Sequence, residues 1–237
     1  MKCAGAEPEF ATFALVDAAA GGSSLLTRCS CDATGFGALD DEELASALSA
    51  AILGDSGAFA VLWSSLQPAV LRYLRVIVGA SAEDVASETW LQAARDLRGF
   101  SGPPRVFRVW LFTIARHRAI DERRRARRRP EEPRELWDRD MADIQPDAAE
   151  DLIQRSDTDW ALSVIATLPK DQAEAVLLRV VAGLDVAQTA QVLGKRPGAV
   201  RIAAMRGLRR LAGHAEVQAR RKAAGRLGLH PPRPEGV

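Results

Sequence analysis

The stretch DVAQTAQVLGKRPGAVRIAAMRGLRRLAG, residues 185–213 of the 237-residue chain, decides the fold. Asp185 and Gln188 have the spacing of a capping box, which predicts the start of a short helix. Gly194 then turns the chain, and Pro197 suits the first position of a second helix. Two helices joined by so short a turn make a helix-turn-helix, whose second helix enters the major groove of DNA.

The second helix of this motif has an apolar face and an arginine face. At about 100° per residue, its inward side chains fall within an arc of about 80°: Val200, Ala204, Leu208 and Leu211. Four arginines spread over the opposite half: Arg201, Arg206, Arg209 and Arg210. Lys195 and Arg196 precede the helix and are expected to hold phosphates, while Arg201 and Arg206 are expected to reach base edges. The alternative is an ordinary amphipathic helix with a solvated face.

Apolar residues at helical spacing predict helices in the rest of the chain, and no strand is needed. Helices at 158–168 and 170–182 complete one small domain, 158–213. A second small domain, 40–129, contains four helices, at 40–53, 56–78, 81–97 and 105–129. Asp40 and Glu43, and again Ser81 and Asp84, have capping-box spacing. Pro68 is expected to kink or divide its helix. In the helix at 81–97, Val85, Thr89 and Leu91 are expected to face inward.

The remaining segments have the composition of extensions and linkers. Residues 1–39 are rich in Ala, Gly and Ser and are expected to form a flexible amino-terminal extension. Residues 130–157 are acidic and contain prolines, which predicts a flexible linker. Residues 214–237 are expected to form a basic, flexible tail. The predicted fold is therefore all-α, with two small helical domains joined by a flexible linker.

The formal net charge of +1 conceals alternating blocks of charge. Residues 103–129 carry 10 basic and 2 acidic residues, and residues 161–237 carry 13 and 5, so each block has a net charge of +8. The intervening block, 130–160, has 3 basic and 11 acidic residues. Such asymmetry predicts two basic surfaces for a polyanion, separated by an acidic spacer that shields them. The excess of Arg over Lys is also what codon bias in a GC-rich genome would produce.

The helix at 105–129 changes character midway. Its first half is apolar nearly all round, which predicts burial, and its second half reads RHRAIDERRRARRR. Aromatic residues gather beside this basic run: Phe100, Phe107, Trp110 and Phe112. Aromatic rings next to cations suit unstacked bases and single strands, although most of these rings are expected in the core. Phe100, in a loop, is the ring expected to be exposed.

Taken together, these segments resemble a bacterial RNA polymerase sigma factor of the extracytoplasmic-function class. ELASALSAAILGDSGAFAVLW (43–63) looks like the start of its region 2. AEDVASETWLQAARDLRGF (82–100) is similar to the polymerase-binding stretch, and FRVWLFTIARHRAIDERRRARRR (107–129) to the stretch that opens and reads the minus-ten element. The segment at 168–211 resembles region 4, which reads the minus-thirty-five element.

The resemblance implies a polymerase subunit that directs promoter-specific initiation and is not an enzyme. It implies docking on the β′ clamp helices of core polymerase through Asp84, Ser87, Glu88, Thr89, Gln92 and Arg95. It implies contact with the melted minus-ten strand through Phe100, Arg105, Arg108, Trp110, Arg116, His117, Arg118, Asp121, Arg124 and Arg125. Base unstacking costs a few kcal/mol, which a pocket for the extruded base would offset.

For the minus-thirty-five duplex the resemblance implies a set on and before the last helix: Lys195, Arg196, Arg201, Ile202, Met205, Arg206, Arg209 and Arg210. Ile202 stands where the family often has a small polar residue, and Ala203 where it often has Arg. These departures predict an unusual minus-thirty-five preference. The resemblance also implies contact with the β flap of polymerase, and an anti-sigma factor is a common partner in the family.

No cofactor and no metal site are predicted. Cys29 and Cys31 are close in sequence, but no histidine is near, and free thiols are the simpler interpretation. No apolar run of about 18 residues predicts a membrane span, and the segment at 10–16 is a poor signal peptide. We therefore expect a cytoplasmic location.

Two other classes of protein were weighed. A helix-turn-helix repressor or activator that never joins polymerase would share the last two helices, but it leaves the domain at 40–129 unexplained. An enzyme is disfavoured because His117, His214 and His230 are dispersed and no nucleophile–base set is legible.

Overall fold

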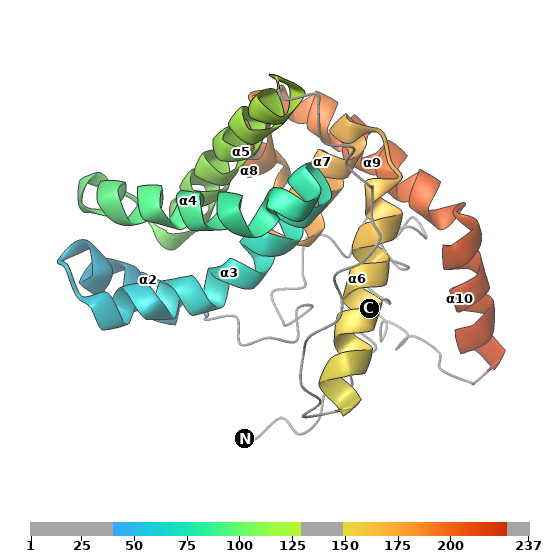
Figure 1. Ribbon diagram of the computed structural model, residues 1–237, viewed down its shortest axis with the longest axis horizontal. Coiled ribbons are helices and arrows are strands. Elements are labelled where there is room, and N and C mark those ends of the chain that lie inside the picture. The colour runs from blue at the N-terminus through green and yellow to red at the C-terminus, as the bar shows by residue number, and fades with distance from the viewer. Residues whose placement is uncertain (1–39, 129–148, 227–237) are drawn as a thin grey trace, which may run out of the picture.

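The computed structural model describes residues 40–128 and 149–226, with side chains from 158 onward to 223 in the second range, and over these ranges the regular elements are helices (Figure 1). Predictions for the amino-terminal extension and its cysteines, for 130–148 of the acidic linker and for the last eleven residues lie outside the described residues. The rest of the predicted linker, 149–157, is helical rather than flexible, because a helix begins at Ala149. No helix of the described ranges has the length and apolar composition needed to cross a membrane.

The first half is a bundle of four helices: α2 (Asp41–Ile52), α3 (Ser56–Val78), α4 (Ala82–Asp96) and α5 (Pro104–Arg128). The capping box at Asp40 is confirmed, because its side chain accepts from the Glu42 and Glu43 amides while Glu43 accepts from the Asp40 amide. The core contains fully buried Leu62, Tyr73 and Phe112, and the Tyr73 and Phe112 rings meet edge to face at 5.8 Å.

Two local expectations in this half are wrong, and a third is narrowed. Of the two alternatives expected at Pro68, division of the helix is wrong, because α3 runs through this residue as one element of 23 residues. Ser81 makes no capping hydrogen bond, and its hydroxyl donates instead to the Glu122 carboxylate of α5 at 3.2 Å. Leu91, expected to face inward with Val85 and Thr89, is 57% exposed on α4.

The second half contains the helix-turn-helix. It consists of α6 (Ala149–Ala166), α7 (Lys170–Val180), α8 (Val186–Leu193) and α9 (Pro197–Ala212). The Asp185–Gln188 capping box is present in both directions, and Gly194 ends α8 with φ 63°, a conformation that glycine adopts without strain. Gly207 lets α9 lie against α7, since a Cβ there would stand 2.8 Å from the Val176 side chain.

A further helix, α10 (Ala215–Arg226), lies where the sequence predicted a flexible tail. Val217 of α10 is buried. The Trp160 indole of α6 donates to the Glu216 carboxylate at 3.0 Å, and the Arg220 guanidinium stands 4.0 Å above the Trp160 ring. Apolar burial and these two polar contacts hold α10 on α6.

The two halves are in contact. Helix α5 lies beside α8, and α3 lies beside α6 and α7 (Figure 1). The buried side chains of both halves form one continuous cluster. An ion pair joins Arg75 of α3 to Asp159 of α6 at 3.7 Å. The basic second half of α5 is therefore not open to solvent all round.

Candidate nucleic-acid interface

Helix α9 presents its arginines to solvent. Val200, Ala204, Gly207 and Leu211 are buried against the domain, as the helical spacing predicted for three of them. Arg201, Arg206, Arg209 and Arg210 are exposed, and none has a carboxylate within 4.0 Å among the residues that the structure describes. Ile202 and Met205 lie on the same outer side and are 48% and 42% exposed. This is a surface suited to a polyanion.

The turn before α9 carries a basic residue that has an acidic partner. The Lys195 ammonium lies 2.9 Å from the Asp171 carboxylate of α7, and this hydrogen bond and charge lower the pKa of Asp171. Both side chains are reached by solvent, so the pair is weak and easily exchanged. Arg196, at the N-cap of α9, is exposed.

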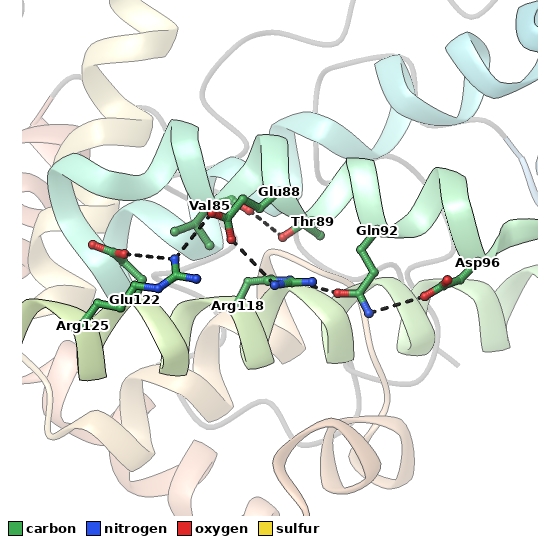
Figure 2. Close-up of polar contacts among 8 residues, drawn as sticks. All are labelled: Val85, Glu88, Thr89, Gln92, Asp96, Arg118, Glu122 and Arg125. Carbon is green, nitrogen blue, oxygen red and sulfur yellow. Dashed lines mark hydrogen bonds and ion pairs between the residues drawn. The ribbon is translucent and has the colours of Figure 1, made fainter.

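Helix α5 differs, because acidic side chains of the protein bind several of its arginines. Figure 2 shows Glu88 and Gln92 of α4 directed at Arg118 and Arg125 of α5. Arg118 donates to the Gln92 amide oxygen at 2.9 Å and pairs with Glu88 at 3.9 Å. Arg125 pairs with Glu88 at 3.5 Å and with Glu122 at 3.9 Å. The predicted polymerase-binding and minus-ten residues are thus in direct contact with each other.

Two more of the predicted minus-ten residues face the second half of the molecule. Arg116 pairs at 3.7 Å with Glu174 of α7, whose side chain is only 2% exposed. Among the residues that the structure describes, the Tyr73 hydroxyl has no hydrogen-bond partner; burial, with the Glu174 carboxylate as a second cause, raises the pKa of Tyr73. Arg108 is half-buried and lies beside Gly183. In this arrangement neither arginine is open to DNA.

The other predicted minus-ten residues are spread along the outside of α5 and the loop before it. Arg105 and His117 are exposed, and Asp121 and Arg124 pair with each other at 3.8 Å. Phe100 is half-buried rather than freely exposed. It forms a cluster with buried Phe107 and half-buried Trp110, with ring centroids 5.3 to 5.6 Å apart. Phe100 and Trp110 are therefore the rings of this cluster that solvent partly reaches, at the amino-terminal end of α5.

The predicted polymerase-binding residues lie on one stripe of α4, with an exception. Asp84, Ser87 and Arg95 are exposed, and Glu88 and Gln92 are half-buried by α5. Thr89 is fully buried, and its hydroxyl donates to the Val85 carbonyl at 2.7 Å (Figure 2), so it offers nothing to a partner.

Leu91 was missed by the sequence reasoning. It lies seven residues after Asp84 and three after Glu88, which at about 100° per residue places it in the middle of the stripe. That spacing was a signal in the sequence. A single exposed leucine is common on protein surfaces, so it is the position of Leu91 within the stripe, and not its exposure alone, that makes it a candidate contact. Elsewhere in the described ranges, no group of three His, Cys, Asp or Glu side chains is placed to hold a metal ion.

Comparison with known proteins bears on both halves. The family model for sigma-70 region 2 matches residues 62–129, and that for sigma-70 region 4 matches residues 158–211. The ECF RNA polymerase sigma factor ShbA of Streptomyces griseus is 34% identical over 70% of this chain and 92% of its own length. The chain belongs to the ECF RNA polymerase sigma factors. It is accordingly a sigma factor, which directs transcription initiation, and not an enzyme.

Other members of the family give the same result. SigD of Mycobacterium tuberculosis is 34% identical over 73% of this sigma factor and 84% of its own length. BldN of Streptomyces coelicolor is 37% identical, and this sigma factor spans 61% of its length. The solved structure of CnrH in complex with the cytosolic domain of CnrY is 22% identical, with a TM-score of 0.50, and covers 76% of this chain and 98% of that one. At this level of identity, the likeness to CnrH shows a shared fold alone.

Proposed function

We propose that this sigma factor reads the minus-thirty-five element as duplex through α9 and the minus-ten element as a melted strand through α5. The exposed arginines of α9 support duplex recognition of the minus-thirty-five element, because they point away from the core and have no acidic partner in the described ranges. The second helix of a helix-turn-helix lies in the major groove, so these side chains meet DNA. Lys195 and Arg196 add phosphate contacts at the amino-terminal end of the helix.

The melted strand is bound by the half-buried rings of Phe100 and Trp110, which pack on buried Phe107, and by the arginines that follow them. An unstacked base gains about 1–3 kcal/mol by stacking on an aromatic side chain, which is comparable with the cost of unstacking. Aromatic edges beside a basic helix therefore favour open DNA once the strands separate. No nucleotide hydrolysis is required.

Core polymerase binds the stripe of α4 formed by Asp84, Glu88, Leu91 and Arg95. Glu88 pairs with Arg118 and Arg125 in this structure, so a polymerase group that binds Glu88 removes one acidic partner from each arginine and makes both more available to DNA. Arg118 then keeps its contact with Gln92, and Arg125 its pair with Glu122. Binding to polymerase and binding to the minus-ten strand are then coupled through the same carboxylate. The place of action is the cytoplasm, where polymerase works. An anti-sigma factor and a contact with the β flap stay predictions.

The test is reconstitution with core polymerase purified from the same organism. Holoenzyme is used to select duplexes from a random library, and the selected duplexes are then transcribed and their start sites mapped. We expect enrichment of two elements upstream of a single start site. A chain that binds duplex without core polymerase, and gives no run-off product with it, would instead be a repressor or activator.

Leu91→Ala is the sharpest variant for the polymerase surface. The side chain is exposed, so folding should be unaffected, while affinity for core polymerase should fall about tenfold, equivalent to about 1.4 kcal/mol. Leu53→Ala is the matched control, because Leu53 is 88% exposed at the end of a different helix, α2. Equal affinities for the two variants would place the docking surface elsewhere.

A further inference from the structure

The outermost line of α9 is apolar over its first two turns and reaches an arginine, Arg209, only near its carboxyl end. At about 100° per residue, Gly198, Ile202, Met205 and Arg209 fall within an arc of about 60°, almost opposite the buried face. Arg201 lies to one side of this arc and Arg206 to the other. Ile202 and Met205, among the few large apolar side chains exposed in the described ranges, therefore occupy the middle of the surface that enters the groove.

Exposed apolar side chains in this position have a specific partner available in DNA. Ile202 and Met205 have no polar group that could bind the donors and acceptors of base edges. The only apolar group in the major groove is the 5-methyl group of thymine. The surrounding arginines make the surface complementary to a polyanion, so duplex DNA fits it better than an apolar protein surface does.

Gly198 supports a close approach along the same line. A Cβ at this position would have no heavy atom within 4 Å, so packing inside the protein does not require glycine here. It is the second residue of α9, at the end of a recognition helix that contacts base edges. The absence of a side chain leaves room outside the helix, where the floor of the groove would lie.

We propose that Ile202 and Met205 are specificity-determining residues that read thymine methyl groups in the minus-thirty-five element, while Arg201 and Arg206 bind the phosphates on either side. This inference rests on the proposed function of α9 and deepens it. It assigns the centre of the recognition surface to apolar contact and its flanks to charge. The sequence-based expectation that Arg201 and Arg206 reach base edges is replaced by this division.

The test changes the DNA by one methyl group at a time. Each thymine of the upstream element, in the duplex selected with holoenzyme, is replaced singly by uracil, and dissociation constants are measured at one salt concentration. Loss of a buried methyl group should weaken binding about fourfold at one or two positions. An upstream element without thymine, or one in which every uracil is neutral, would overturn the proposal.

A variant chain then links the effect to the two residues. Ile202→Ala with Met205→Ala should bind the thymine and uracil duplexes equally, and alanine keeps the helix intact. Arg201→Ala is the matched control: it should bind both duplexes more weakly while the ratio of about four persists. A ratio that survives the double change would refute the assignment to Ile202 and Met205. Failure to select any upstream element would overturn the proposed function itself. That result differs from uracil substitutions without effect and from a ratio that survives the double change, which overturn only the assignment to Ile202 and Met205.

Discussion

Helices α5 and α9 are both rich in arginine, and both are predicted to bind DNA, yet their surroundings differ. On α5 the guanidinium groups of Arg116, Arg118 and Arg125 bind glutamates of α4, α5 and α7. On α9 the four arginines have no such partner in the ranges described. Three arginines of α5 are thus bound within the protein, while the four of α9 are available to a partner.

The difference shows that local charge does not by itself measure readiness to bind a polyanion. A phosphate must displace Glu174 before it reaches Arg116, and must compete with Glu88 for Arg118 and Arg125, whereas on α9 it replaces only water and counterions. The arginines of α9 are available to bind DNA in the free chain. Arg116, Arg118 and Arg125 of α5 become available when their ion pairs with Glu88 and Glu174 are exchanged for contacts with DNA. Three experiments test this contrast.

The largest effect is expected at the buried pair between the two halves. Glu174→Ala leaves the half-buried Arg116 without its partner, and breaking such a pair costs about 3 kcal/mol in the free energy of unfolding. Chemical denaturation of the full chain measures it. Asp171→Ala is the control on the same helix, since its pair with Lys195 is exposed and should cost less than about 1 kcal/mol. Similar costs for both would mean that Glu174 is not buried against α5.

An intermediate effect is expected in the salt dependence of DNA binding by the free chain. Arg206→Ala should lower the slope of log K against log salt by about 1, because a phosphate contact is lost. Arg118→Ala should leave the slope unchanged, because Glu88 and Gln92 already hold that guanidinium. The slopes are measured by titrating one DNA duplex with each variant at several NaCl concentrations. Equal losses would remove the contrast between the helices.

The smallest effect concerns Lys195, the basic residue beside α9 that does have an acidic partner. The pKa of Asp171 lies below its ordinary value of 3.8, so the pair stabilises the fold at neutral pH, and this contribution is lost as the pH falls through the lowered pKa. Lys195→Ala should return the pKa of Asp171 towards that ordinary value. An NMR titration of the carboxyl group reports it. An unchanged pKa would show that the ion pair does not persist in solution.

Much of the fold could be predicted because it depends on near neighbours in the chain. The capping boxes at Asp40 and Asp185 and the inward face of α9 follow from residues three or four positions apart. The exposure of Leu91 could also have been found from its spacing to Asp84. The Ser81 cap was wrong because Glu122, 41 residues away, competes for the hydroxyl.

By itself the sequence determined the all-helical architecture, the helix-turn-helix and the family, since periodicity, caps and motifs act over short distances. Only the tertiary structure decided which arginines are available. Glu174 and Arg116 are 58 residues apart, and their meeting depends on how α7 packs against α5. The docking of α10 through Trp160 and Glu216, 56 residues apart, was equally hidden. Burial and pairing are properties of packed surfaces, and no local pattern specifies which surfaces meet.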